Sequence, residues 1–200
     1  IDALMGMSVY VGTVLLGLGL LLGFYLTVVF IVAGVSPSNF LSRVREVQLL
    51  AFSTSSSAAV MPLSIKTAEE KLGVQSSTAD FIVPLGATIN MDGTALYQVV
   101  AAAFLTQVFG IELSSGELLL LITTTIGASI GSPSTPGVGI VILATILTNI
   151  GVPASGIALI IGVDRILDMS RTAINVTGDL TACVVMDRWL PTESVDLEAV

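Results

Sequence analysis

The sequence contains the stretch Asp164-Arg165-Ile166-Leu167-Asp168-Met169-Ser170-Arg171-Thr172-Ala173-Ile174-Asn175-Val176-Thr177-Gly178-Asp179. At about 100° per residue, a helix over this stretch gathers its main charged and amide side chains within an arc of roughly 80°. The side chains on that arc belong to Asp164, Asp168, Arg171, Asn175 and Asp179. The opposite side carries the apolar residues Leu167, Met169, Ile174 and Val176. The stretch therefore predicts a helix with one narrow polar face.

The chemistry of this polar face points to a small charged solute. A carboxylate such as Asp168 binds an amino group, a guanidinium such as Arg171 binds a carboxylate through two hydrogen bonds, and the Asn175 amide can hold a second carboxylate. The alternative is a stripe of internal ion pairs that only joins helices. Charged groups inside a membrane are usually functional, which favours a binding site.

The composition places the chain in the membrane class. Of its 200 residues, 54% are hydrophobic and only 11% are charged, whereas a soluble domain has about 25% charged residues. The formal charge is −8 and there is no basic patch, so nucleic-acid binding is not expected. There is no histidine and no visible pair of nucleophile and base, so an enzyme is not expected either.

Two long uncharged stretches indicate membrane segments. No charged residue lies between Asp2 and Arg43, which allows one spanning helix over 8–34. None lies within residues 118–163, a length of about 70 Å as a helix and roughly twice a bilayer core. The turn residues 131–139 must break this second stretch, which predicts a hairpin.

Residues 44–66 predict another hairpin, because serine and threonine residues fill the middle of this apolar segment. Basic residues flank both of its ends, and such residues favour the cytoplasmic side. They are Arg43, Arg45, Lys66 and Lys71. The second hairpin, with acidic neighbours at Glu112 and Glu117, would enter from the opposite side. The sequence thus predicts an all-α membrane protein in which spanning helices alternate with two oppositely oriented re-entrant helical hairpins.

Such paired interruptions are typical of transporters with a binding site near the middle of the bilayer. Residues 1–190 are predicted to form one transport domain, followed by a polar cytoplasmic tail over 191–200. The predicted elements are a helix over 8–34, a re-entrant hairpin over 44–66, an interrupted helix over 80–109, a re-entrant hairpin over 118–150 and a helix over 157–186.

The interruption of the helix over 80–109 reads Asn90-Met91-Asp92-Gly93-Thr94. Asp92 is the only charged residue between Asp80 and Glu112. Local unwinding here would free backbone carbonyls, which together with a carboxylate and an amide are suitable ligands for Na⁺. The alternative is a helix kink capped by Asp92.

Taken together, three motifs resemble the glutamate/aspartate:cation symporters of the dicarboxylate/amino acid:cation symporter family. They are Ser55-Ser56-Ser57, Asn90-Met91-Asp92-Gly93-Thr94, and the pattern from Asp168 to Asp179. The resemblance implies Na⁺-coupled uptake of L-aspartate or L-glutamate by an elevator-like movement. It also implies a multi-pass protein of the cell membrane with a cytoplasmic C-terminus. Scaffold helices are expected upstream of this chain, and a homotrimer is expected for the full-length protein.

The resemblance also implies site residues by position. The substrate would contact Ser56, Met91, Thr94, Thr135, Gly139, Asp168, Arg171, Thr172 and Asn175. One Na⁺ would bind Gly86, Asn90, Asn175 and Asp179. A second would bind carbonyls of Thr88, Ser129, Ile130 and Ser132, and a third the side chains of Asn90 and Asp92. The chain departs from the family pattern at Thr54 and Met169, where archaeal and animal members, respectively, carry arginine.

Other functions remain open from the sequence. Within the same family, coupling to protons, or transport of neutral amino acids or C4-dicarboxylates, is the alternative. In another class, a channel or a structural membrane module would also use re-entrant hairpins. Arg165 either pairs with Asp164 or Asp168 or lines the aqueous path.

Overall fold

The computed structural model describes residues 2–153 and 155–190, and every regular element in these ranges is a helix. The predicted all-helical class is therefore confirmed. The predicted tail, residues 191–200, lies outside the described residues. In chain order the elements are α1 (Asp2–Val28), the π-helical turn η1 (Val29–Ala33), α2 (Pro37–Thr54), α3 (Ser57–Thr67), the π-helical turn η2 (Ala68–Leu72), α4 (Ser76–Ile89), α5 (Asp92–Val108), α6 (Ser115–Ser129), α7 (Val138–Asn149) and α8 (Ser155–Trp189).

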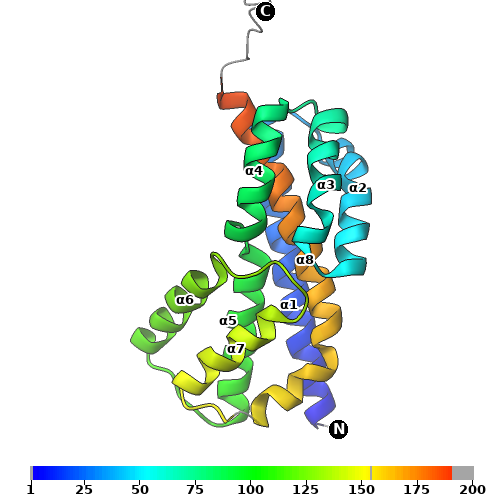
Figure 1. Cartoon of the computed structure of the whole chain (residues 1–200). Coiled ribbons are helices and arrows are strands. Elements are labelled where there is room, and N and C mark those ends of the chain that lie inside the picture. The colour runs from blue at the N-terminus through cyan, green and yellow to red at the C-terminus, as the bar shows by residue number, and fades with distance from the viewer. Residues whose placement is uncertain (1, 154, 191–200) are drawn as a thin grey trace, which may run out of the picture.

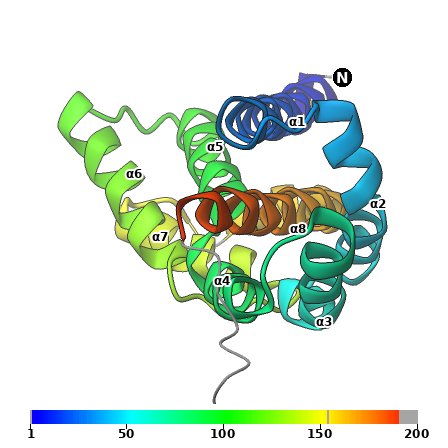
Figure 2. The same ribbon diagram turned by 90° about the horizontal axis from the view of Figure 1, so that it is seen from above.

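Helix α8 forms the axis of the molecule. It has 35 residues, which corresponds to about 52 Å. Seen from above, it lies in the centre and is surrounded by α1, α2, α3, α4 and α5 (Figure 2). The five residues of the predicted polar face are all buried in this packing. The sequence pattern therefore identified a face of α8 that is turned into the protein.

Helices α2 and α3 form the first helical pair. Ser55 ends α2 in the left-handed conformation, with φ of 53°, and the hydroxyl of Ser56 caps α3 by accepting a hydrogen bond from the amide of Ala59 at 3.2 Å. Helix α2 begins at residue 37, before the predicted hairpin start at residue 44. The reason is local, since Ser36 caps the helix and Pro37 occupies its first turn.

Helices α6 and α7 form the second helical pair. The Ser114 hydroxyl and amide both donate to the Glu117 carboxylate, which closes a capping box at the start of α6 and lowers the pKa of Glu117. Residues 130–137 then connect the two helices. Gly131 and Gly137 have φ of 77° and 78° in this connection, a conformation that favours glycine.

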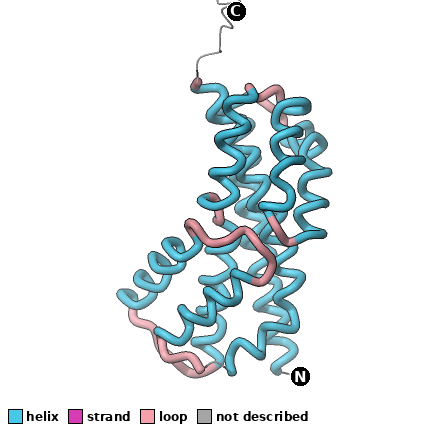
Figure 3. The backbone as a smooth tube through the Cα atoms, viewed as in Figure 1, coloured by secondary structure: helices cyan, strands magenta, loops and turns pink. Residues whose placement is uncertain are grey.

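The two helical pairs occupy opposite halves of the molecule and meet at their tips (Figure 1). The Ser56 hydroxyl donates to the carbonyl of Ser134 at 2.8 Å. At the same level, the break between α4 and α5 joins this contact, because the Gly131 amide donates to the carbonyl of Thr88 at 2.7 Å. Figure 3 shows these three loop segments gathered across the middle of the helical bundle.

Two apolar cores lie on either side of this polar level. One core joins α2, α3, α4 and the C-terminal half of α8, with Phe40, Val83 and Leu180 among its buried members. The other joins α1, α5, α6, α7 and the N-terminal half of α8, and includes Leu105 and Leu167. The hydrogen bonds between the two helical pairs thus lie between the two cores.

Among the described residues, one helical segment is both long and apolar enough to cross a membrane, namely Met5–Ala33. Its outward side chains are apolar and exposed, including Leu16, Leu20 and Ile31. Helix α8 also has sufficient length, but its charged face lowers its mean hydropathy. Helices α6 and α7 are apolar but shorter than a bilayer core.

The close packing of α8 gives a test of the fold. A Cβ atom at Gly178 would lie 2.7 Å from the Tyr25 hydroxyl oxygen and 2.4 Å from Asn90 Nδ2. Gly178→Ala should therefore lower the free energy of unfolding by about 1–3 kcal/mol through overpacking. Gly162→Ala is the matched control, because it lies in the same helix with no atom within 4 Å of the added Cβ. Thermal unfolding of the purified protein measures both, and equal midpoints would contradict this packing.

Candidate functional site

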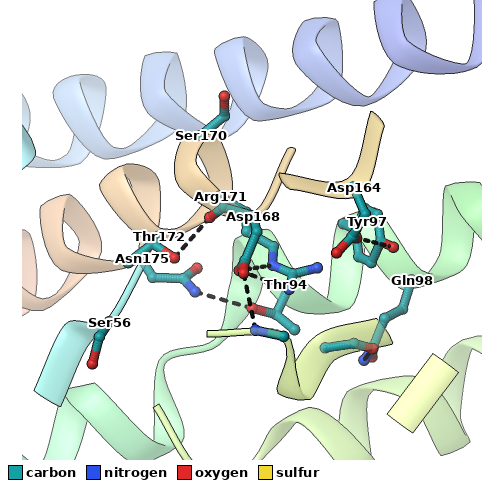
Figure 4. Close-up of polar contacts among 12 residues, drawn as sticks. Ser56, Thr94, Tyr97, Gln98, Asp164, Asp168, Ser170, Arg171, Thr172 and Asn175 are labelled. Atoms are coloured by element: carbon teal, nitrogen blue, oxygen red, sulfur yellow. Dashed lines mark hydrogen bonds and ion pairs between the residues drawn. The ribbon is translucent and has the colours of Figure 1, made fainter. Parts of the chain in front are cut away.

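The centre of the site is an ion pair within α8. The Arg171 guanidinium donates to Asp168 Oδ1 through Nη2 at 2.8 Å and Nε at 3.1 Å, and both side chains are almost fully buried. The second oxygen of Asp168 accepts a hydrogen bond from the Gly137 amide at 3.0 Å. Asp168 therefore connects α8 to the tip of the α6–α7 pair (Figure 4).

The other side of the Arg171 guanidinium packs on an aromatic ring. Its Cζ lies 4.3 Å from the centroid of the Tyr97 ring, and the Tyr97 hydroxyl donates to Asp164 Oδ1 at 2.5 Å. Gly139 leaves the space for the guanidinium, since a Cβ there would lie 2.3 Å from Nη2. Among the described residues, Arg171 Nη1 is buried without a hydrogen-bond partner. A buried cationic donor without a partner is costly, so this atom favours an incoming anion.

Asn175 ties α8 to the break between α4 and α5. Its Nδ2 donates to Thr94 Oγ1 at 3.1 Å and to the Met91 sulfur at 3.4 Å, and its Oδ1 accepts from the Gly93 amide at 2.8 Å. The side chain thus has three partners, Met91 in the break and Gly93 and Thr94 in the first turn of α5. The break between α4 and α5 therefore brings the start of α5 against α8.

The structure brings the predicted substrate residues together. A small pocket between the two tips and α8 is lined by Met91, Thr94, Thr135, Gly139, Asp168, Arg171, Thr172 and Asn175. Ser56 lies beside this pocket and holds Ser134, while its neighbours Ser55 and Ser57 contribute to the lining. Binding by these residues remains a prediction. The spacing of these residues in the sequence did not by itself predict that they would share one pocket.

The residues predicted for the first cation site also meet. Asn90 Nδ2 donates to the carbonyl of Asn175 at 3.2 Å and to Asp179 Oδ1 at 2.9 Å. A Cβ at Gly86 would lie 2.6 Å from the same Asp179 oxygen, so the α4 backbone approaches this carboxylate directly. Asp179 is 2% exposed and forms no ion pair with a described residue. The Asn90 amide therefore lies between the Asn175 carbonyl and the Asp179 carboxylate, and oxygens of these kinds are suitable ligands for a hard cation.

The second predicted set lies at the start of the 130–137 connection. The carbonyl of Thr88 accepts from the Gly131 amide, and the carbonyl of Ser129 accepts from the Ser132 amide at 3.2 Å. Ile130 lies between these residues in sequence. The four predicted carbonyls thus belong to one small region, where the end of α4 meets the end of α6.

In the third predicted set, Asn90 and Asp92 face different helices. Asn90 points to α8, as described above, whereas Asp92 Oδ2 accepts a hydrogen bond from the Tyr25 hydroxyl of α1 at 2.8 Å. In the described part of the chain, no three His, Cys, Asp or Glu side chains form a metal cluster.

Sequence reasoning missed three residues of the site. Tyr97 and Gln98 lie one turn after Thr94 on α5, so helical spacing was a signal that placed them near the pocket. Gln98 is fully buried, donates to the carbonyl of Gly139 at 2.9 Å and accepts from the Ser129 hydroxyl at 3.1 Å. Tyr25 gave no signal, because its partner is 67 residues away.

Arg165 does not belong to the buried polar face of α8. Its side chain is exposed, while Asp164 accepts from Tyr97 and Asp168 pairs with Arg171. Of the alternatives that the sequence left open, the described residues show neither of the two ion pairs.

Comparison with known proteins gives a consistent result. A sequence profile of the sodium:dicarboxylate symporter family matches residues 1–189. A proton/sodium-glutamate symport protein of Bacillus subtilis is 45% identical over 172 residues, which cover 84% of this chain and 40% of that protein. Excitatory amino acid transporter 2 of Homo sapiens is 39% identical over 86% of this chain and 30% of its own length. An excitatory amino acid transporter of Caenorhabditis elegans is 41% identical over 86% of this chain and 35% of its own length. The chain thus spans well under half the length of these relatives.

The central ion pair gives a test of the site. Asp168→Asn keeps the size of the side chain but leaves the Arg171 charge buried without an anion, which should cost about 3–5 kcal/mol of folding stability. The double variant Asp168→Asn/Arg171→Met removes both charges and should recover much of this loss. Thermal unfolding compares the two. An Asp168→Asn protein as stable as the wild type would show that the pair is not formed.

Proposed function

Because the chain belongs to the sodium:dicarboxylate symporter family, we propose that it forms the substrate-binding transport domain of a Na⁺-coupled symporter for L-aspartate or L-glutamate. The observation that carries this proposal is the buried Arg171 guanidinium, whose Nη1 atom has no hydrogen-bond partner and which lines a pocket between two hairpin tips. The names of the similar bacterial, human and nematode proteins support the same substrate class.

Substrate binding is an exchange of ion pairs. The side-chain carboxylate of an acidic amino acid binds Arg171, and Asp168 is then released to bind the amino group. Asn175 and Thr172 lie within the same pocket and offer hydrogen bonds to the α-carboxylate. One internal pair is replaced by two intermolecular pairs, so Arg171 and Asp168 each keep an opposite charge. The α-carboxylate adds one negative charge, which Asn175 and Thr172 stabilise by hydrogen bonds alone.

The buried charges of α8 require a cation. Three carboxylates, those of Asp164, Asp168 and Asp179, are buried with one guanidinium, that of Arg171, which leaves a formal excess of two negative charges. Na⁺ bound by the Asp179 carboxylate with the carbonyls of Gly86, Asn90 and Asn175 would offset part of this excess. The Asn90 amide, which now donates to Asp179, would turn away.

Asn175 couples the two ligands. Its side chain contacts Thr94 and Met91 in the substrate pocket, and its carbonyl accepts from Asn90 in the cation region. A cation that fixes this backbone carbonyl also fixes the side-chain amide of the same residue. Binding of Na⁺ and binding of the amino acid therefore favour each other.

The distribution of charge supports one orientation in the cell membrane. Arg43 donates to the carbonyl of Lys71, Lys71 pairs with Glu46, and Arg188 donates to the carbonyl of Ala33, so these basic residues share one end of the bundle. We place this end, and with it the C-terminus of α8, in the cytoplasm. The pair α2–α3 is then re-entrant from the cytoplasm and α6–α7 from outside.

In this proposal the full-length protein is a multi-pass homotrimer. Its transport domain, to which this chain corresponds, crosses the membrane by an elevator-like movement. The closed tips exclude water from the site while it moves. Lipid surrounds the exposed apolar face of α1.

Proton coupling is the second candidate, because a similar protein carries the name of a proton/sodium symporter. Neutral amino acids and C4-dicarboxylates are less suitable substrates. The former would leave Arg171 without an anion, and the latter have no amino group for Asp168.

Uptake of labelled aspartate into vesicles containing the full-length protein tests the function. An inward Na⁺ gradient should drive accumulation above the external concentration, and replacing Na⁺ with choline should abolish it. Accumulation driven equally well by a pH gradient without Na⁺ would favour the proton-coupled alternative. Flux without accumulation would indicate a channel.

Arg171→Thr tests the substrate class. Loss of the charged hydrogen bonds should reduce aspartate affinity by about 10- to 100-fold, while neutral amino acids gain uptake. Arg165→Thr removes an exposed arginine from the same helix and should leave selectivity unchanged. Undiminished aspartate uptake by Arg171→Thr would refute the assigned role of this residue.

A further inference from the structure

Tyr25 is one of two buried tyrosines in the mainly apolar helix α1. Helix α1 turns apolar side chains outward, but Tyr25 is only 5% exposed and faces the interior. Its hydroxyl donates to Asp92 Oδ2 at 2.8 Å. This hydrogen bond connects α1 to the first turn of α5, directly after the unwound segment.

The same hydroxyl also lies against the cation region. A Cβ added to Gly178 would be 2.7 Å from the Tyr25 oxygen and 2.4 Å from Asn90 Nδ2, so both groups approach one point on α8. Asn90 in turn donates to Asp179. Helix α1, the break between α4 and α5, and helix α8 thus meet at Tyr25. The carboxylates of Asp92 and Asp179 are bound on either side of this meeting point.

These two carboxylates lack basic partners. Within the described residues, neither Asp92 nor Asp179 forms an ion pair with a lysine or an arginine. The Tyr25 hydroxyl and the Asn90 amide are instead their side-chain donors. A phenol gives its single proton to one carboxylate oxygen and leaves the other oxygen available to a cation.

We propose that Tyr25 is a positioning residue for cation binding: its hydroxyl holds the Asp92 carboxylate in one orientation and thereby sets the affinity for Na⁺. The Asp92 side chain is exposed, so it would rotate freely without this hydrogen bond. Restricting that rotation before binding lowers the entropic cost of capturing the ion. The inference rests on the proposed Na⁺-coupled function and adds a residue that acts through Asp92.

The test is a Na⁺ titration of Tyr25→Phe in the full-length protein reconstituted in liposomes. This variant removes the hydroxyl but keeps the ring that packs on Gly178. The Na⁺ concentration for half-maximal aspartate uptake should rise about tenfold. At saturating Na⁺, both the maximal rate and the KM for aspartate should return to wild-type values.

Two controls separate positioning from a general structural effect. Tyr10→Phe removes the hydroxyl of another buried tyrosine of α1 and should leave the Na⁺ dependence unchanged. In the Asp92→Asn background, Tyr25→Phe should have no further effect on Na⁺ dependence, because the hydroxyl acts through the carboxylate. As a second measurement, thermal stabilisation of the detergent-solubilised protein by Na⁺ should require about tenfold more Na⁺ in Tyr25→Phe.

The outcomes distinguish this inference from the function on which it rests. A wild type that ignores Na⁺ would overturn the proposed coupling, and this inference with it. A Na⁺-dependent wild type whose Tyr25→Phe variant behaves like Tyr10→Phe would overturn the inference alone. An equal effect of Tyr25→Phe in the Asp92→Asn background would overturn it as well.

Discussion

Burial of charge along α8 is the constraint on which the structure depends. Charges between two apolar cores are stable only when each has a partner, and the three aspartates of the stripe have different ones. Asp168 holds Arg171, Asp164 accepts from Tyr97, and Asp179 accepts from Asn90. Each partner comes from α8 itself or from a segment that packs against it. The neighbouring helices therefore supply hydrogen-bond donors to Asp164 and Asp179, whereas Asp168 alone has an opposite charge.

The breaks between helices provide backbone hydrogen-bond partners for the buried polar groups of α8. Unbroken helices have few free backbone groups in their middle, whereas ends and turns offer both amides and carbonyls. Here the turn at Ser55, the break at Asn90 and the connection 130–137 meet at the level of the stripe. The Gly137 amide, for example, reaches Asp168 from the connection.

The sequence indicated which groups are buried but not how they pair. Helical geometry is periodic, so the positions of Asp168 and Asp179 on one face followed from spacing alone, and glycine and proline marked the break at 131–139. The pairing of these side chains depends instead on how the helices pack against one another. The hydrogen bond from Tyr25 to Asp92 joins two helices whose packing no local pattern encodes. The Arg171–Asp168 pair likewise competes with other arrangements that have the same spacing, such as pairs made by Arg165.

We propose that one face of α8 binds the amino acid and the cation together, with Asn175 shared between them. Calorimetric titration of aspartate into the purified full-length protein at several Na⁺ concentrations tests this proposal. The Kd for aspartate should fall steeply as the Na⁺ concentration rises, and binding should be negligible without Na⁺. A Kd that is independent of Na⁺ would contradict the shared site.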